Sequence, residues 1–439
     1  MKAVPPRVSG WILSAALTSL PGCNASESSP ATPPSSQFGS PSAGAAGNTG
    51  SAGANETGAG GITGGATGSN ETGTGGTQLP PTATPPAPPA ALAAFAYVGG
   101  YNNQISVFSM DKDTGALTPR GSAVSADPNP SFLAFAPNGK FLFAVNEADN
   151  LSGTNAGAVS AFRIDAATGG LTFINRVSSQ GNGPAHVSVD HAGKFVFVAN
   201  YNGGTIAVLP VGADGTLGSA VATDAHGSNA QAHEAIIDAT NQFLFTPNKG
   251  LSNISQYRFD ASNGQLTPNT PPAVALAAGA GTRHLAFHPT QPYAYAINEL
   301  DDTMVTLAFN PSQGTLTPIQ TLSTLPEGVN GSNNSCAEVQ VAPSGKFVYG
   351  SNRGHDTIVI YAVSSQTGML SLVGHQATGG ATPRSFHLDV SGKVLLVANQ
   401  NANQVVTFAV DTVTGLLTQR GSVNVQAPSF VGVLYLPAR

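Results

Sequence analysis

A few ionisable side chains recur at matching positions in this sequence, beside short segments of alternating apolar residues. Some begin a first segment, some come one residue earlier, and some follow the Asn that ends the next segment. These residues are His186, His233, Glu234, Arg283, His284, Glu299, Glu338, Arg353 and Arg384. Only 9% of the chain is charged, so a cluster of such groups would indicate a functional site.

The residue types in this set point to proton transfer and anion binding. His and Glu transfer protons when their pKa values lie near the working pH. Arginine holds a carboxylate or a phosphate through two parallel hydrogen bonds, and it can also stabilise an oxyanion. No Gly-x-Ser-x-Gly motif lies between a strand and a helix, so we expect no acyl-enzyme.

The stretch 281–302 shows how the chain would position such side chains. Residues 285–287 and 293–297 alternate in polarity or size, which predicts two strands joined by a turn that contains proline. In an antiparallel hairpin the start of the first strand and the end of the second lie at the same edge. The residues expected at this edge are Arg283, His284 and Glu299.

This hairpin belongs to a unit that repeats from Phe95 onward with a period of about fifty residues, as propeller blades do. Third and fourth strands follow it, for example at 158–164 and 171–173, and four antiparallel strands form one blade. The first two strands of each complete unit span 132–146, 186–200, 234–248, 284–298, 338–352 and 385–399.

The two ends of the repeat region complete a seventh unit. Residues 95–98 have the pattern of a second strand without a first, and residues 429–434 have that of a first strand with nothing after it. Pairing them would close the ring and remove exposed sheet edges. The sequence therefore predicts an all-β, seven-bladed β-propeller over residues 92–439.

The N-terminal region predicts export. Residues 1–23 combine a basic start with a short apolar run, and they end in Leu-Pro-Gly-Cys, which resembles a lipobox that would lipidate Cys23. Residues 24–91 are rich in Gly, Ser, Thr and Pro, which predicts a disordered linker. No later segment is long and apolar enough to span a bilayer. We expect an exported lipoprotein, anchored only by its lipid, facing the periplasm or the cell exterior.

Several other functions are disfavoured. The net charge of -6 argues against a nucleic-acid partner. His186, His233 and Glu338 show no ligand spacing, so we expect no metal and no cofactor. Cys336 is interpreted as a small filler residue rather than a catalytic thiol. The histidines at turns and strand ends carry no functional argument; they are His191, His226, His288, His355, His375 and His387.

The motifs together resemble the seven-bladed propeller lactonase family, which includes propeller-type 6-phosphogluconolactonase and carboxy-muconate cyclase. The stretches that carry the resemblance are 97–99, 186–190, 281–289, 298–300, 337–339, 351–356 and 382–384. The sequence departs from the family at three places. Gln340 occupies a position where members often carry His, Glu234 replaces a small residue, and Asn241 replaces a turn glycine.

The resemblance implies hydrolysis of a small lactone, which we expect to be anionic, and we expect the protein to be a monomer. From the chemistry of the side chains we expect that His186 or Glu338 activates water, that Arg283 and Arg353 hold the substrate or the oxyanion, and that other residues orient them. The orienting residues are His233, His284, Glu299 and Arg384, and Glu234 adds a carboxylate. Export disfavours a cytosolic phosphorylated lactone and favours an unphosphorylated sugar lactone or another cyclic ester. A lactonising enzyme similar to muconate cyclase and a non-catalytic propeller that binds a surface protein or glycan remain as alternatives.

Overall fold

A computed structural model describes residues 92–227 and 229–437. The predicted export signal, the lipidation of Cys23 and the linker fall outside these residues. The regular secondary structure of the described chain is all strand, apart from two short 3₁₀ helices, η1 (Leu151–Gly153) and η2 (Gly331–Asn333). Neither helix of this described part is long and apolar enough to cross a membrane.

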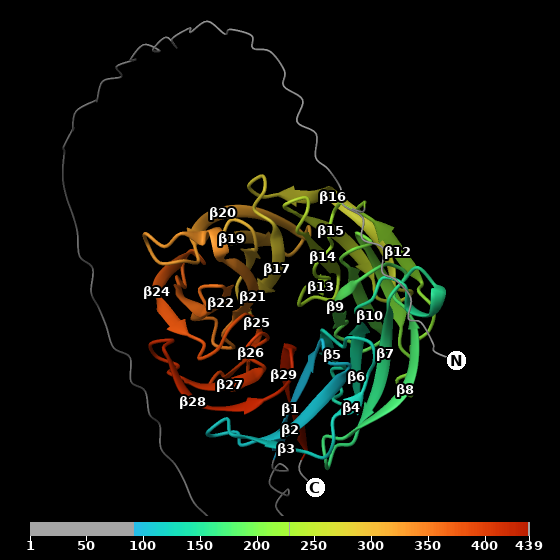
Figure 1. Ribbon diagram of the computed structural model, residues 1–439. Helices are drawn as coiled ribbons and strands as arrows, with labels where there is room; N and C mark the ends of the chain where they lie inside the picture. Colours follow the sequence, from blue (N-terminus) through green and yellow to red (C-terminus); the bar gives the residue numbers. More distant parts are fainter. Residues whose placement is uncertain (1–91, 228, 438–439) are drawn as a thin grey trace, which may run out of the picture. The chain divides into compact units, whose positions relative to one another are not determined.

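Seven antiparallel sheets surround a central channel, with the first strand of each sheet innermost (Figure 1). The prediction of an all-β, seven-bladed propeller is therefore confirmed. The blades are β5 (Leu133–Phe135), β6 (Phe141–Asn146), β7 (Ala158–Ile164) and β8 (Leu171–Ser178); β9 (Pro184–Val189), β10 (Phe195–Asn200), β11 (Thr205–Pro210) and β12 (Ala222–Ala225); β13 (Ile236–Ile237), β14 (Phe243–Asn248), β15 (Asn253–Asp260) and β16 (Gln265–Ala275); β17 (Thr282–Phe287), β18 (Tyr293–Asn298), β19 (Thr303–Asn310) and β20 (Thr315–Ser323); β21 (Ser335–Val341), β22 (Phe347–Arg353), β23 (Thr357–Val363) and β24 (Leu370–Ala377); β25 (Pro383–Leu388), β26 (Val394–Asn399), β27 (Gln404–Val410) and β28 (Leu417–Asn424); and β29 (Pro428–Pro437), β1 (Leu92–Gly100), β2 (Gln104–Met110) and β3 (Leu117–Pro119), with β4 (Val124–Ser125) also paired to β2.

The last blade is built from both ends of the described chain. Strand β29 pairs antiparallel with β1, and the register places Phe95 opposite Leu434 and Val98 opposite Val431. The innermost strand of this blade therefore comes from the C-terminal end, as the incomplete repeats predicted. Because the ring closes on itself, each blade has a neighbouring blade on both of its faces.

The core lies between neighbouring blades. The alternation of apolar residues gives every inner strand two buried faces, which pack on the blades at either side. A buried tyrosine joins the blades at three equivalent places, because the hydroxyls of Tyr97, Tyr295 and Tyr349 donate to backbone carbonyls of the next blade. The first of these carbonyls belongs to Gly169, which has φ of 73° and no room for a side chain, because an added Cβ would lie 2.4 Å from Phe95.

A β-bulge near the start of several inner strands positions the polar side chains. In β17 the pairing shifts between Thr282 and His284, so that Arg283 is the extra residue. In β25 the same shift makes Arg384 the extra residue. A bulge leaves its extra residue outside the ladder and re-aims its side chain. Each of these bulges therefore places an arginine at the mouth of the channel.

Candidate functional site

Equivalent residues from all seven inner strands meet inside the channel. We call this set the channel layer; it consists of Phe132, His186, Glu234, His284, Glu338, Ser385 and Phe430. The ring of Phe132 lies 4.3 Å from that of His186 and 4.7 Å from that of Phe430, between centroids. The rings of His186 and His284 are 5.8 Å apart. One side of the channel layer is therefore aromatic, with Phe132 and Phe430. The other side carries the histidines and the carboxyls.

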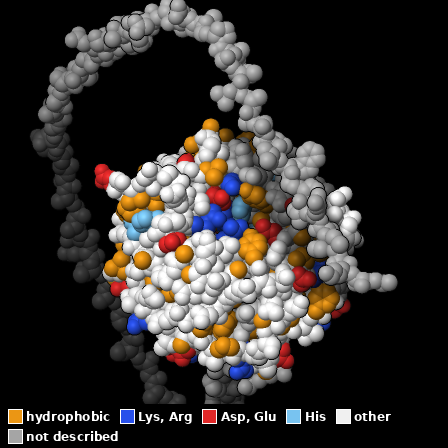
Figure 2. All heavy atoms as spheres, viewed as in Figure 1, with side chains coloured by type: hydrophobic (Ala, Val, Ile, Leu, Met, Phe, Trp, Pro, Cys, Tyr) orange, Lys and Arg blue, Asp and Glu red, His pale blue; other side chains and the backbone are white. Residues whose placement is uncertain are grey.

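A group of cations lies above this layer, where the second strands end. We call Lys249, Arg283, Glu299, Arg353 and Arg384 the arginine rim. The Glu299 carboxylate lies 3.0 Å from Lys249 Nζ, 3.2 Å from Arg283 Nε and 3.1 Å from Arg353 Nη2. The Nε–H bond of Arg283 does not point at the carboxylate, so this contact is an ion pair without a hydrogen bond. Figure 2 shows Lys and Arg side chains gathered at the centre of this face.

Glu299 stays ionised and Arg283 stays charged. Burial alone would raise the pKa of Glu299, but Arg283, Arg353 and Lys249 outweigh it and lower the pKa to about 2. Burial and the nearby Arg353 lower the pKa of Arg283 to about 10. The rim therefore places three cations around one ionised carboxylate at neutral pH.

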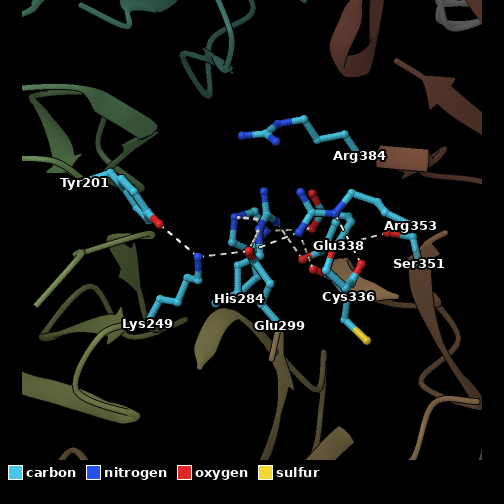
Figure 3. Close-up of polar contacts among 12 residues, drawn as sticks. Tyr201, Lys249, His284, Glu299, Cys336, Glu338, Ser351, Arg353 and Arg384 are labelled. Atoms are coloured by element: carbon cyan, nitrogen blue, oxygen red, sulfur yellow. Dashed lines mark hydrogen bonds and ion pairs between the residues drawn. The ribbon is translucent and has the colours of Figure 1, made fainter. Parts of the chain in front are cut away.

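Arg384 belongs to the rim but lies apart from Glu299. In Figure 3 its side chain runs above Arg353 and Glu299, and no contact joins it to either of them. Its Nη2 atom donates to the hydroxyl of Tyr101 at 3.0 Å, and its guanidinium lies 5.4 Å from the centre of that ring. Tyr101 in turn donates to Glu147 at 2.9 Å. No carboxylate of the described chain lies within ion-pair distance of Arg384, so its guanidinium group is able to form an ion pair with a ligand.

The carboxyls of the channel layer are held in a different state. Burial raises the pKa of Glu338 to about 7. Burial and the proximity of Glu338 raise the pKa of Glu234 well above its usual value. Burial also lowers the pKa values of His186 and His284 well below theirs, with Arg283 adding to the effect. At neutral pH the imidazoles are therefore neutral, and Glu338 is the group whose protonation changes.

The hydrogen bonds of the histidines decide which of them can accept a proton. The backbone N–H of Ala235 donates to Nδ1 of His186 at 3.4 Å, so the lone pair of this neutral ring faces the backbone. Its Nε2 atom carries the proton and lies 3.6 Å from Glu234. His233 differs, because its Nδ1 atom is buried without a hydrogen-bond partner in the described chain. Burial lowers the pKa of His233 well below the usual value.

The structure brings all nine predicted residues to the channel, but in two levels rather than one. His186, Glu234, His284 and Glu338 lie in the channel layer, whereas Glu299, Arg353 and Arg384 belong to the rim. Arg283 spans both levels, since its Nη1 atom donates to the carbonyl of Ala337 at 2.6 Å and contacts His284 at 3.2 Å. The ring of His233 lies 5.1 Å from that of His284, between centroids.

Sequence reasoning missed four residues of the site. Lys249 and Tyr201 each follow the Asn that ends the second strand of a blade. Lys249 Nζ donates a hydrogen bond to the hydroxyl of Tyr201 at 2.9 Å. Tyr101 occupies the same position in the closing blade, but it follows Gly100, so the Asn signal is missing. His387, predicted to carry no function, lies close enough to Glu338 for their charges to interact.

Two further predictions concern Cys336 and metals. Cys336 is fully buried beside Thr324, and burial raises its thiol pKa well above the usual value, so the thiol remains protonated. This agrees with its interpretation as a filler residue. Within residues 92–227 and 229–437, no group of three or more His, Cys, Asp or Glu side chains is arranged to hold a metal ion.

Known proteins resemble this chain over nearly all of the propeller. Residues 95–433 match the family described as "Lactonase, 7-bladed beta-propeller". A 6-phosphogluconolactonase of Bacillus subtilis is 33% identical over 301 residues, which cover 67% of this chain and 83% of that protein. A 6-phosphogluconolactonase of Formosa agariphila is 32% identical, with coverage of 67% and 86%.

A solved structure agrees with these sequence matches. The periplasmic gluconolactonase of Pseudomonas aeruginosa superposes with a TM-score of 0.72 at 31% identity. The match covers 79% of this chain and 100% of that structure. The resemblance seen in the sequence motifs is thus confirmed, and this chain belongs to the seven-bladed β-propeller lactonase family.

Proposed function

We propose that this protein hydrolyses a sugar lactone at the arginine rim. One observation carries the proposal: a cationic rim lies next to the buried carboxyl of Glu338, whose pKa is about 7. A rim of this kind suits substrate oxygens and a developing negative charge, and such a carboxyl suits a general base. The names of the relatives, 6-phosphogluconolactonase and gluconolactonase, support this substrate class.

The substrate that the rim fits best is anionic or rich in hydroxyls. Glu299 neutralises only part of the charge of Lys249, Arg283 and Arg353, and Arg384 has no ion pair in the described chain. Guanidinium groups bind phosphate or carboxylate oxygens in pairs. We infer that Arg353 and Arg384 hold an anionic substituent or the hydroxyls of the sugar, with Glu299 orienting the arginines.

In the proposed reaction Glu338 is the general base rather than His186. The His186 lone pair is committed to a backbone N–H, whereas Glu338 titrates near neutral pH. Water attacks the lactone carbonyl carbon while its proton passes to Glu338. Arg283 stabilises the oxyanion that forms on the carbonyl oxygen. The ring C–O bond then breaks, and the leaving oxygen takes the proton that Glu338 received from the water, which returns Glu338 to its starting state.

The remaining residues act through these groups. His284 lies between Arg283 and Glu338 and orients both of them. Glu234 supplies a second carboxyl on the same level, and burial together with the nearby Glu338 raises the pKa of Glu234. The product is an open hydroxy acid, which ionises and releases one proton for each turnover at neutral pH.

We also infer that the protein is exported, that Cys23 is its lipid attachment site and that it is a monomer. The periplasmic location of the Pseudomonas aeruginosa relative supports export, and the Leu-Pro-Gly-Cys motif supports lipidation. Metabolic labelling with a fatty-acid analogue tests the second point, because Cys23→Ser would abolish the label. A species twice the expected mass in solution would contradict the third.

The decisive experiment is a pH-stat assay with glucono-1,5-lactone and its 6-phosphate, corrected for spontaneous hydrolysis. We expect enzyme-dependent acid release with at least one of them. The Glu338→Gln protein serves as the matched inactive control. Failure to accelerate the opening of any lactone in a wider panel would overturn the proposal.

A further inference from the structure

The channel also opens on the opposite face of the ring. A cavity of about 430 Å³ extends from the channel layer along the inner strands to their hairpin turns, and we call it the far cavity. The rim residues lie at the starts of the inner strands, whereas Ala239 and Pro289 at the cavity mouth follow the ends of β13 and β17. The far cavity is therefore separate from the rim, with the channel layer between them.

The walls of the far cavity are apolar. They include Ile236, Phe287, Val339 and Val341, and Phe132 and Phe430 of the channel layer complete the inner end. Its volume lies within the range of about 300–1,000 Å³ that is usual for small-molecule sites. An apolar chain of a few carbon atoms would be removed from water there.

The polar groups near the mouth are already bonded to the protein. Nε2 of His288 lies 3.0 Å from the carbonyl of Gly345, and its Nδ1 atom accepts from two backbone N–H groups of the following turn. Gln340 donates to one backbone carbonyl and accepts from one backbone N–H. His191 contacts a backbone carbonyl at 2.9 Å. These three side chains therefore contribute little to the recognition of a ligand.

The inner end is different, because two buried carboxyls line it. Glu234 is 5% exposed and Glu338 is 6% exposed. One oxygen of Glu234 accepts the N–H of Leu285 at 2.5 Å, but its other oxygen makes no hydrogen bond within the described chain. Its closest ionisable partner is the neutral His186, at 3.6 Å. Among the residues of the described chain that line the cavity, none is a lysine or an arginine.

We propose that the far cavity is a second binding site, which takes a small organic cation with a short apolar chain. The ammonium group would lie against the carboxyls of Glu234 and Glu338, and the chain would lie along Ile236, Val339 and Val341. A cation in this place stabilises the ionised forms of two poorly solvated carboxyls, which burial otherwise disfavours. A charge-assisted hydrogen bond to a buried carboxylate is stronger than one from a neutral hydroxyl.

Binding at this site would also inhibit the reaction, a consequence that rests on the proposed function. A cation beside Glu338 holds its carboxylate in an ion pair and weakens it as a base. Because substrate binds on the other side of the channel layer, inhibition would lower kcat and leave KM almost unchanged. Such a ligand would therefore act as a noncompetitive inhibitor.

The test is calorimetric titration of the full-length protein with n-butylammonium and, separately, with n-butanol, without substrate. We expect saturable one-to-one binding of the cation, at least about tenfold tighter than the alcohol. Glu234→Gln should weaken cation binding about tenfold or more. Ala239→Trp should block the mouth from an exposed turn, whereas Ala192→Trp, on a neighbouring exposed turn outside the lining, should bind as the wild type does.

Equal affinity for the alcohol and the cation, or no saturable binding, would overturn the proposal. Full affinity in the Ala239→Trp protein would do the same, because the ligand would then be elsewhere. The binding measurement does not depend on turnover. A protein that binds the cation but opens no lactone would therefore support the site while refuting the proposed function.

Discussion

Nη1 of Arg283 lies 3.2 Å from Nε2 of His284, a contact that assigns the tautomer of this buried imidazole. A guanidinium group has only donors, so Nε2 must accept, and the proton of the neutral ring is on Nδ1. Nδ1 lies 3.3 Å from Oε1 of Glu338 and donates to it. Arg283 therefore orients Glu338 through a single imidazole, in addition to its proposed role at the oxyanion.

Replacement of Arg283 by Ala should lower kcat/KM for lactone hydrolysis at least about 100-fold, because it removes the oxyanion donor and leaves the His284 tautomer free. Arg283→Lys should recover only part of the rate, since an ammonium cannot contact Ala337, His284 and the substrate together. Initial rates in a pH-stat measure both effects. The control is Arg258→Ala, an exposed arginine stacked on Phe243. Near-normal rates for Arg283→Ala would exclude its proposed role.

The rate should depend on pH through Glu338. Burial raises the pKa of this carboxyl to about 7, and a general base must be deprotonated to act. We therefore expect kcat/KM to fall about tenfold per pH unit below pH 7 and to level off above it. Glu338→Gln should lower the rate at least about 100-fold and remove this pH dependence. The matched control is Glu327→Gln, on an exposed loop, which should keep both the rate and the profile. A wild-type profile that is flat between pH 5 and 8 would argue against Glu338 as the base.

Arg384 should discriminate between charged and neutral substrates. Its guanidinium has no ion pair in the described chain, so an anionic group on the substrate would be its first close countercharge. Arg384→Ala should raise KM for a phosphorylated lactone about tenfold or more, and change kcat little. For the unphosphorylated lactone the change in KM should be several times smaller. Tyr101→Phe, which removes one partner of Arg384, should have a weaker effect in the same direction. If both substrates lose affinity equally, Arg384 does not recognise charge.

Much of the fold could be predicted from the sequence, because a propeller repeats its pattern. Alternating segments at a regular period gave the strands and the number of blades. The pairing of β29 with β1 followed from two incomplete repeats, 95–98 and 429–434. Such regularity arises because every blade must bury both faces against equivalent neighbours.

The site was predicted in its membership but not in its geometry. The prediction placed all nine residues at one edge, whereas the structure separates a channel layer from a rim. A one-residue β-bulge moves Arg283 and Arg384 out of the channel layer and into the rim. No residue type in the sequence predicts where such a bulge occurs. The far cavity could not be predicted from the sequence either, because it depends on which side of the channel layer the carboxyls of Glu234 and Glu338 face. Contacts between distant blades decide these points.

Phe430 allows a test of how the ring is closed. This residue lies on β29, is 8% exposed and packs 4.7 Å from Phe132 of the next blade, between ring centroids. Phe430→Ala should lower the free energy of unfolding by about 3–5 kcal/mol, because it leaves a cavity where the C-terminal strand meets the first complete blade. Phe173→Ala is the matched control, since Phe173 is 52% exposed at an outer strand and should cost less than about 1 kcal/mol. Urea unfolding followed by circular dichroism measures both values. If the two variants were equally stable, the closing strand would contribute little to the ring, and the stability would have to come from the blades that are continuous in sequence.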